Sequence, residues 1–161
     1  MELIHRPRRL RDGDAIRRLC RETRLSADSL IYPIFVDETL SGKRPIDSLP
    51  GQYQYGLDTV EEAIAECISA GVHSCILFGI PAHKDEVGSS AWDPEGAIQK
   101  AIRKIKASYP DFYIITDVCM CEYTDHGHCG ALCDHKVDND ATLELLSKVA
   151  LSHAQAGANM V

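Results

Sequence analysis

The sequence predicts an α/β fold in which buried strands alternate with amphipathic helices around a parallel sheet. Apolar runs rich in β-forming residues begin near residues 30, 74, 112 and 159, and a helical apolar pattern separates each run from the next. No glycine-rich phosphate turn follows any run, which argues against the competing doubly wound open sheet. Eight such units would need roughly 330 residues, somewhat above the ~250 usual for a (β/α)8 barrel. We therefore predict the N-terminal half of a (β/α)8 TIM barrel, truncated at the start of its fourth strand.

Residues 1–11 are predicted to form a short N-terminal arm, and residues 12–161 to form the half barrel. The arm has little apolar content and carries four arginines, namely Arg6, Arg8, Arg9 and Arg11. The simplest interpretation is that the arm is a solvated, extended segment. The alternative is that it binds another subunit. A short helix started by Asp12 or Asp14 follows. Its predicted apolar face consists of Ala15, Ile16, Leu19 and Cys20.

The first strand is predicted over residues 30–36, a continuous apolar run whose length suits a strand buried on both faces. Pro33 lacks a backbone N–H, so it counts against a central antiparallel position. Glycine and proline punctuate residues 37–57, which predicts a loop longer than a simple connection needs.

Two helices with clear periodicity flank the second strand, predicted over residues 75–78. The first helix begins at Asp58 or Thr59 and ends at Gly71. Its apolar stripe consists of Val60, Ala63, Ile64, Cys67 and Ile68. The second helix is predicted to open at Asp93, with a proline at its first position. Its buried face consists of Ala97, Ile98, Ala101, Ile102 and Ile105.

A third strand, predicted over residues 112–118, leads into a loop rich in cysteine and histidine that extends to about residue 137. Asp138 or Asp140 is predicted to cap the last helix, which Gly157 closes. The apolar positions of that helix are Leu143, Leu146, Val149 and Ala150. Residues 159–161 are predicted to begin a fourth strand.

Composition limits the classes of function. The chain has 161 residues and a net charge of −7, so its overall charge does not attract nucleic acid or an anionic membrane. The longest apolar run is far shorter than a membrane span, and no apolar stretch follows the basic N-terminus as in a secretory signal. A protein of the cytoplasm is the expectation.

The seven cysteines indicate metal binding. An odd count without a signal peptide argues against a disulfide framework. Cys20, Cys67 and Cys75 lie on apolar faces and are predicted to be core residues. The other four lie within fifteen residues and include Cys119, Cys121 and Cys129.

The spacing of these three cysteines, C-x-C-x7-C, predicts an open zinc site. Cys119 and Cys121 leave the carboxyl end of the third strand, and residues i and i+2 of an extended chain project to the same side. The loop that follows is long enough to bring Cys129 back beside them. Three thiolates select zinc and leave a coordination position for substrate, where the ion acts as a Lewis acid.

Alternative roles for this segment stay open. Cys133, His126, His128 or His135 could supply a fourth ligand and close a structural zinc site, or the cysteines could bind no metal. Asp117, two residues before the first ligand, is a candidate catalytic residue that would hold a substrate ammonium or orient catalytic groups. Its alternative role is to cap local backbone.

The segment around these cysteines resembles the zinc-using branch of the porphobilinogen synthase (5-aminolevulinate dehydratase) family. Further segments resemble that family in the expected order: residues 6–11, 22–26, 30–36, 77–81 and 137–142. The resemblance covers essentially the whole chain.

The resemblance implies a (β/α)8 barrel that condenses two molecules of 5-aminolevulinate into porphobilinogen with loss of two waters, in tetrapyrrole (haem) synthesis. It implies that Cys119, Cys121 and Cys129 hold zinc, which polarises an oxygen of the second substrate, and that Asp117 lines the active site. It also implies a homo-octamer and an allosteric Mg2+ site for the full-length protein.

The family's two Schiff-base lysines belong to later strands, and none of the seven lysines here matches them. We therefore expect the 161 residues alone to be inactive. The alternatives are a non-catalytic zinc-binding domain and an assembly partner of a complementary half.

Overall fold

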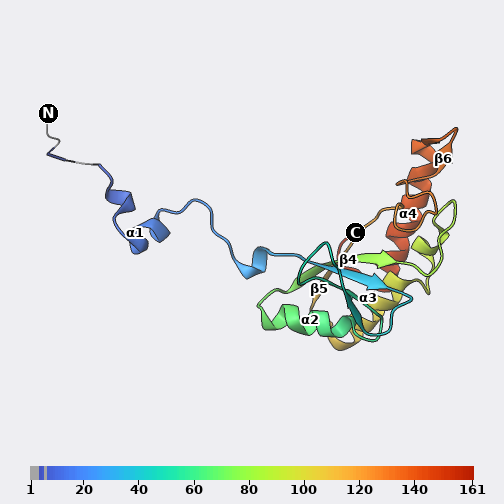
Figure 1. Cartoon of the computed structure of the whole chain (residues 1–161), viewed down its shortest axis with the longest axis horizontal. Helices are drawn as coiled ribbons and strands as arrows, with labels where there is room; N and C mark the ends of the chain where they lie inside the picture. The colour runs from blue at the N-terminus through green and yellow to red at the C-terminus, as the bar shows by residue number, and fades with distance from the viewer. Residues whose placement is uncertain (1–3, 6) are drawn as a thin grey trace.

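The computed structural model describes residues 4–5 and 7–161, which form a β/α body with a long N-terminal extension (Figure 1). The α-helices are α1 (Asp14–Leu19), α2 (Val60–Ser69), α3 (Ala97–Ser108) and α4 (Asn139–Ala156). The strands are β1 (Tyr32–Asp37), β2 (Lys43–Pro45), β3 (Tyr53–Tyr55), β4 (Ser74–Ile80), β5 (Tyr113–Thr116), β6 (Leu132–Cys133) and β7 (Lys136–Val137). Three 3-10 turns complete the order: η1 (Arg9–Arg11), η2 (Ala27–Ser29) and η3 (Ser89–Trp92).

Five strands form one sheet in the order β2-β3-β1-β4-β5. β1, β4 and β5 are parallel neighbours connected through α2 and α3, as the predicted alternation requires. After α4 the chain returns to the sheet, where Met160 forms a parallel bridge with Ile115 beside β5. The three predicted β/α units are therefore present in the predicted order, with a single bridge where the fourth strand was predicted to begin, and the fold class is confirmed.

The main core lies between the sheet and the helices α2 and α3. Helix α2 contacts β1 and α3, and α3 contacts β1, β4 and α4. The largest side chains that the sheet and these helices bury are Ile34, Tyr55, Ile64, Leu77, Ile98, Ile102, Ile105 and Ile114. The predicted stripe of α2 is buried except for Ile68, which is 38% exposed. Helical and strand periodicity thus identified most of this core.

Two of the predicted core assignments among the cysteines are confirmed and one is wrong. Cys67 and Cys75 are buried, whereas Cys20 is exposed. Helix α1 buries no residue, because it lies on the extension away from the body (Figure 1). Its apolar periodicity therefore predicts a helix correctly, but the helix buries no side chain against the rest of residues 4–5 and 7–161.

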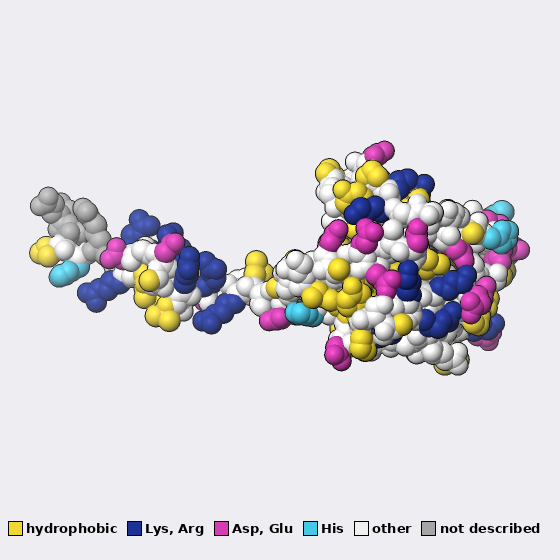
Figure 2. Space-filling view, turned by 90° about the horizontal axis from the view of Figure 1, so that it is seen from below, with side chains coloured by type: hydrophobic (Ala, Val, Ile, Leu, Met, Phe, Trp, Pro, Cys, Tyr) yellow, Lys and Arg dark blue, Asp and Glu magenta, His cyan; other side chains and the backbone are white. Residues whose placement is uncertain are grey.

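The extension carries both charge and apolar side chains. Figure 2 shows basic side chains around it, all of them arginines, with apolar patches between them. Leu10, Leu19 and Leu25 are 60%, 72% and 87% exposed. Arg8, Arg9 and Arg11 are exposed as predicted, and Arg6 lies outside the described residues.

Residues 37–57 are not the structureless loop that was predicted. They contain β2 and β3, an antiparallel pair that adds to the sheet through a short parallel contact between β3 and β1. On this edge of β1, β3 pairs only with Phe35 and Val36. The missing N–H of Pro33 therefore costs no hydrogen bond to β3. The alternation of Tyr53, Gln54 and Tyr55 is the strand signal that the surrounding glycines and prolines obscured.

Helix α3 begins later than predicted. Its N-cap is Gly96, because Asp93 closes a turn before the helix. The Asp93 carboxylate accepts the Glu95 N–H (2.8 Å), and the Asp93 carbonyl accepts the Gly96 N–H (2.9 Å). Aspartate in such a turn competes with helix formation, so the Asp-Pro signal marked the approach to the helix rather than its start.

Helix α4 has the predicted ends. The Asp138 carboxylate accepts the Ala141 N–H (3.1 Å) at the N-terminus, and Gly157 takes a positive φ of 109° at the C-terminus. Of its predicted apolar positions, Val149 is fully buried and Leu143 is 55% exposed. No helix within the described part of the chain is both long and apolar enough to span a lipid bilayer.

Candidate metal centre

The residues that follow β5 leave the sheet at its carboxyl end. The Asp117 N–H still donates to the Leu77 carbonyl of β4 (3.2 Å), which extends the ladder one residue beyond the strand. The metal loop, residues 119–130, begins two residues later. Met120 is fully buried and Tyr123 is 3% exposed, and both pack in a second apolar cluster with Ala91 and Val149. These two side chains anchor the loop, so the cysteines beside Met120 turn the other way.

The three sulfurs predicted to bind metal lie together. The Sγ atom of Cys119 is 3.3 Å from that of Cys121 and 3.4 Å from that of Cys129. All three sulfurs lie within 4.8 Å of one another. Tetrahedral zinc with bonds near 2.3 Å separates its sulfurs by about 3.8 Å. Shifts of a few tenths of an ångström would therefore suit the ion, and three sulfurs are the donor set that zinc prefers.

The predicted alternatives for a fourth ligand do not join this cluster in the described residues. Cys133 is exposed on the β6–β7 hairpin, and His135 follows it in that turn with a φ of 62°. His126 uses both ring nitrogens: Nδ1 accepts the His128 N–H (3.1 Å), and Nε2 donates to the Glu86 carbonyl (3.1 Å). The cluster therefore contains three ligand atoms rather than four.

The surroundings of Cys119 and Cys121 favour the protonated form of both thiols. Burial raises the pKa of the Cys119 thiol. The hydrogen bond with Cys119, followed by burial, raises the pKa of Cys121 to about 12. A bound cation reverses this preference, because a coordinated thiol is deprotonated.

Two acidic side chains accompany the sulfurs. Asp117 is half-buried, and burial raises the pKa of its carboxyl, opposed by the Val118 N–H. Burial also raises the pKa of Glu122 to about 7, with the charge of Asp117 adding to the shift and Lys84 opposing it. The sequence analysis did not single out Glu122, because an acidic residue in a polar loop gives no signal of its own.

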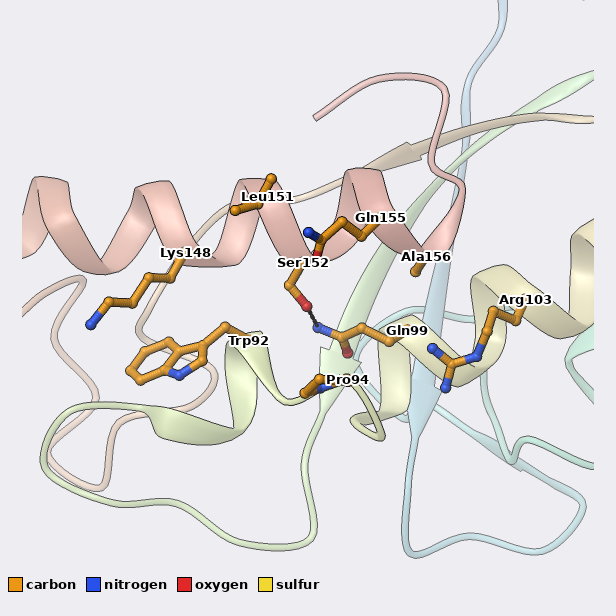
Figure 3. Close-up of a pocket in the computed structure, with 9 residues that line it drawn as sticks. All are labelled: Trp92, Pro94, Gln99, Arg103, Lys148, Leu151, Ser152, Gln155 and Ala156. Carbon is orange, nitrogen blue, oxygen red and sulfur yellow. Dashed lines mark hydrogen bonds between the residues drawn. The ribbon is translucent and has the colours of Figure 1, made fainter.

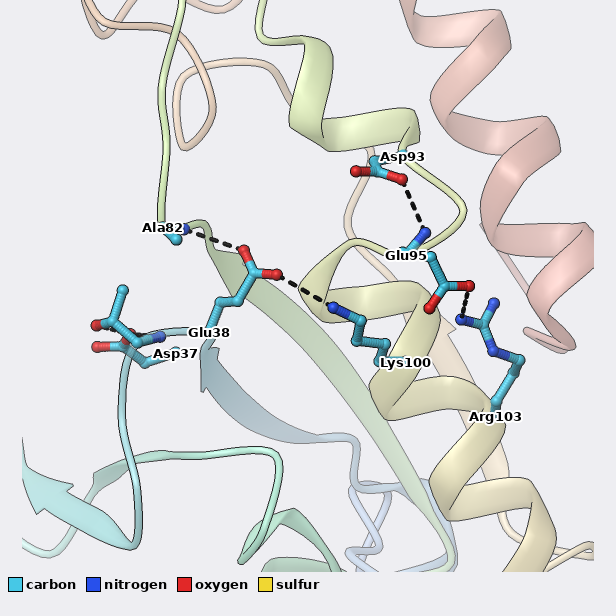
Figure 4. A network of polar contacts seen from close by, with 8 residues as sticks. Asp37, Glu38, Ala82, Asp93, Glu95, Lys100 and Arg103 are labelled. Carbon is cyan, nitrogen blue, oxygen red and sulfur yellow. Dashed lines mark hydrogen bonds and ion pairs between the residues drawn. The ribbon is translucent and has the colours of Figure 1, made fainter.

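The carboxylates at the end of β1 are already paired. Figure 4 shows Glu38 accepting the Ala82 N–H (3.1 Å) and facing the Lys100 ammonium (3.5 Å), so it joins the ends of β1 and β4 to α3. Asp37 is buried and pairs with the Arg44 guanidinium at 2.8 Å. These contacts stabilise the rim of the sheet, whereas Asp117 has no ion pair among the described residues.

A hollow of about 210 Å³ lies between η3, α3 and α4 and shares no residue with the metal loop (Figure 3). At one end the Lys148 ammonium lies 5.5 Å from the centre of the Trp92 ring. Further along the hollow, the buried Gln99 amide donates to the Ser152 hydroxyl (2.9 Å). The first contact joins η3 to α4 and the second joins α3 to α4, and the sequence offered no motif for either.

Comparisons with known proteins agree on one family. The model described as "ALAD: Delta-aminolevulinic acid dehydratase" matches residues 4–161. A delta-aminolevulinic acid dehydratase of Ruminiclostridium josui is 54% identical over 159 residues, which are 99% of this chain and 78% of that relative. The relative from Archaeoglobus fulgidus is 52% identical over 97% of this chain and 48% of its own length. That from Escherichia coli K12 is 43% identical over 99% and 49%.

A solved structure gives the same result for the fold. The crystal structure of the Toxoplasma gondii ME49 enzyme, in complex with its reaction product porphobilinogen, superposes with a TM-score of 0.92 at 33% identity. The match covers 99% of this chain and 46% of that one. This chain therefore spans about half the length of most relatives it matches, and corresponds to the first half of their barrel. By sequence and by structure, the chain belongs to the delta-aminolevulinic acid dehydratase family.

Proposed function

We propose that this chain supplies the metal-holding half of a porphobilinogen synthase. The complete protein would condense two molecules of 5-aminolevulinate into porphobilinogen and release two waters. One observation carries the proposal: Cys119, Cys121 and Cys129 converge at the carboxyl end of the sheet. In barrels of this type, that end carries the active site.

In this proposal the three cysteines hold the ion and Asp117 contacts the substrate. Zinc, when bound, supplies a Lewis acid that polarises an oxygen of the substrate. Met120 and Tyr123 exclude water from beneath the loop, because both are buried in the second apolar cluster. Asp117 lies between β5 and the first ligand, half-buried and without an ion pair in the described part of the chain, so it is placed to accept hydrogen bonds from a substrate ammonium.

The condensation also needs groups outside these 161 residues. The family resemblance assigns the two Schiff-base lysines to later strands, where they would activate the substrate carbonyls. We therefore propose that residues 1–161 alone do not turn over 5-aminolevulinate.

The finer parts of the assignment depend on the same resemblance. They are zinc as the ion, a homo-octamer for the complete protein, a separate Mg2+ site and a location in the cytoplasm. The thiolate donor set supports zinc over magnesium at the cysteines. Native mass spectrometry of the complete protein tests the octamer, and metal analysis after dialysis tests the ions.

The activity test uses the complete protein with added zinc under reducing conditions. Porphobilinogen formation should fall at least 100-fold in Cys129→Ala, on the order expected when a catalytic metal loses a ligand. Cys133→Ala is the matched control, because Cys133 is an exposed cysteine near the same loop but outside the cluster. Equal activity of the two variants, or turnover by residues 1–161 alone, would contradict the proposal.

A further inference from the structure

Besides the sulfur contacts, six hydrogen bonds lie within the metal loop, and each joins residues no more than four positions apart. The N–H groups of Tyr123 and Thr124 donate to the Met120 carbonyl (both 2.9 Å), and the Thr124 hydroxyl donates to the His128 carbonyl (2.9 Å). No helix or strand of the structure lies within residues 119–130. Contacts with neighbouring segments therefore add to the support of this loop.

A second segment supplies that support. Residues 82–92, here called the bracing loop, connect β4 to the turn before α3. Asp85 forms a parallel bridge with Thr124: its N–H donates to the Tyr123 carbonyl (3.3 Å), and its carbonyl accepts the Asp125 N–H (3.0 Å). The neighbouring Glu86 carbonyl accepts the His126 Nε2–H (3.1 Å). The bracing loop thus holds residues 123–126 of the metal loop through its own backbone.

The side chain of Asp85 keeps the bracing loop in this shape. Its carboxylate accepts the N–H groups of Val87 (3.2 Å) and Ser89 (2.9 Å) and the hydroxyl of Ser89. The hydrogen bonds from Ser89 hold the pKa of Asp85 below its usual range, so the carboxylate stays charged. Asp85 therefore closes the turn with its side chain and forms hydrogen bonds to the metal loop with its backbone.

Packing makes the same junction tight. Gly88, with a φ of 66°, approaches the metal loop so closely that a Cβ would lie 2.8 Å from the Met120 Cε and 3.2 Å from the Tyr123 Cβ. The turn closed by Asp85 brings Gly88 to this position, since the Gly88 N–H donates to the Asp85 carbonyl (3.3 Å). A change in the turn would therefore shift Met120, which stands between two of the ligands.

We propose that Asp85 is a positioning residue for the metal centre, which preorganises the three sulfurs without contacting the ion. This inference depends on the proposed metal site. A preorganised loop binds the ion more tightly, because its residues lose less conformational entropy on binding. Support of this indirect kind is typically worth about 10–100-fold in metal affinity.

The test measures zinc affinity of the complete protein, under reducing conditions, by competition with a chromophoric chelator. Asp85→Ala should weaken zinc binding about 10–100-fold. Asp85→Asn, which keeps an acceptor for the turn, should lose less. Asp93→Ala is the matched control, because Asp93 closes a comparable turn with its carboxylate but does not contact the metal loop, and it should bind zinc like the wild type.

A second measurement separates positioning from loss of a ligand or of the fold. The thiolate-to-metal charge-transfer band of the Co2+-loaded Asp85→Ala protein should match that of the wild type at saturation, since the same three sulfurs bind. Wild-type affinity in Asp85→Ala, or an altered band at saturation, would overturn the positioning role. Failure of the wild type itself to bind zinc would instead overturn the proposed metal centre, and this inference with it.

Discussion

Gly79 lies on β4 where the sheet meets the metal loop, and its lack of a side chain has a measurable role. It is buried, and a Cβ at this position would collide with the Tyr123 hydroxyl and lie 2.8 Å from the Ile98 Cγ1. Extra atoms in a packed core typically cost about 1–3 kcal/mol. Gly79→Ala should therefore lower the free energy of unfolding by that amount in chemical denaturation.

The contact partner gives the control for this prediction. Tyr123→Phe removes the hydroxyl that the new methyl group would strike, so the double variant should recover part of the loss. Additive effects of the two substitutions would show that the hydroxyl does not set the available space.

His153 links α4 to β5 and gives a pH-dependent stability. It is fully buried, and its Nδ1 lies 3.0 Å from the Thr116 hydroxyl. Burial lowers the pKa of His153 to about 4, against 6.5 for the ordinary side chain. Because the unfolded chain then binds the proton more readily, stability is complete above about pH 6.5 and falls as the pH drops towards 4. The loss cannot exceed about 3 kcal/mol.

Thermal unfolding between pH 7 and pH 4.5 checks this prediction. The melting temperature of the wild type should fall more steeply than that of His153→Gln, whose amide does not titrate. His73→Gln is the control at an exposed histidine and should follow the wild type. Parallel curves for the wild type and His153→Gln would contradict the assignment.

At the scale of single residues, the sequence predicted the cluster of three cysteines that the structure brings together, but not the residues around it. Cys119, Cys121 and Cys129 were found because three cysteines so close together in one loop are typical of a metal site. Glu122 and Asp85 carry no such signal, since a buried carboxylate and a turn-closing carboxylate look like any acidic residue in a polar loop. Their surroundings come from β4 and its loop, which are distant in sequence.

At the scale of elements, the cap of α4 can be tested directly. The Asp138 carboxylate accepts the Ala141 N–H, and its backbone joins the helix to the end of the metal loop through Ala131 (2.8 Å). Asp138→Ala should destabilise the protein by about 1 kcal/mol in thermal or chemical unfolding. Asp140→Ala, in the same first turn but without a capping bond, should cost under about 0.5 kcal/mol. A similar loss in both variants would mean that charge near the helix end, rather than the cap, is responsible.

The sequence predicted which elements exist better than where they end. Helices α2, α3 and α4 follow from apolar periodicity, because that periodicity reflects the face that each buries. The start of α3 was misplaced since the local turn at Asp93 competes with the helix. β2 and β3 were missed because each has only three residues, and the short alternation in β3 stands among glycines and prolines.

At the scale of the whole molecule, the alternation of strands and helices determined the fold class, and the exposed extension could not be foreseen from it. Helix α1 has an apolar face, as a buried helix would, yet no partner for it exists among the described residues. Whether a periodic helix packs depends on the rest of the assembly.

We propose that three sulfurs, and no fourth protein ligand, hold one zinc ion at the carboxyl end of the sheet. X-ray absorption at the zinc edge of the complete, zinc-loaded protein tests it most directly. We predict three sulfur neighbours at about 2.3 Å and one lighter neighbour that substrate changes. Four sulfurs, the signature of a histidine ring, or zinc without sulfur neighbours would contradict the account.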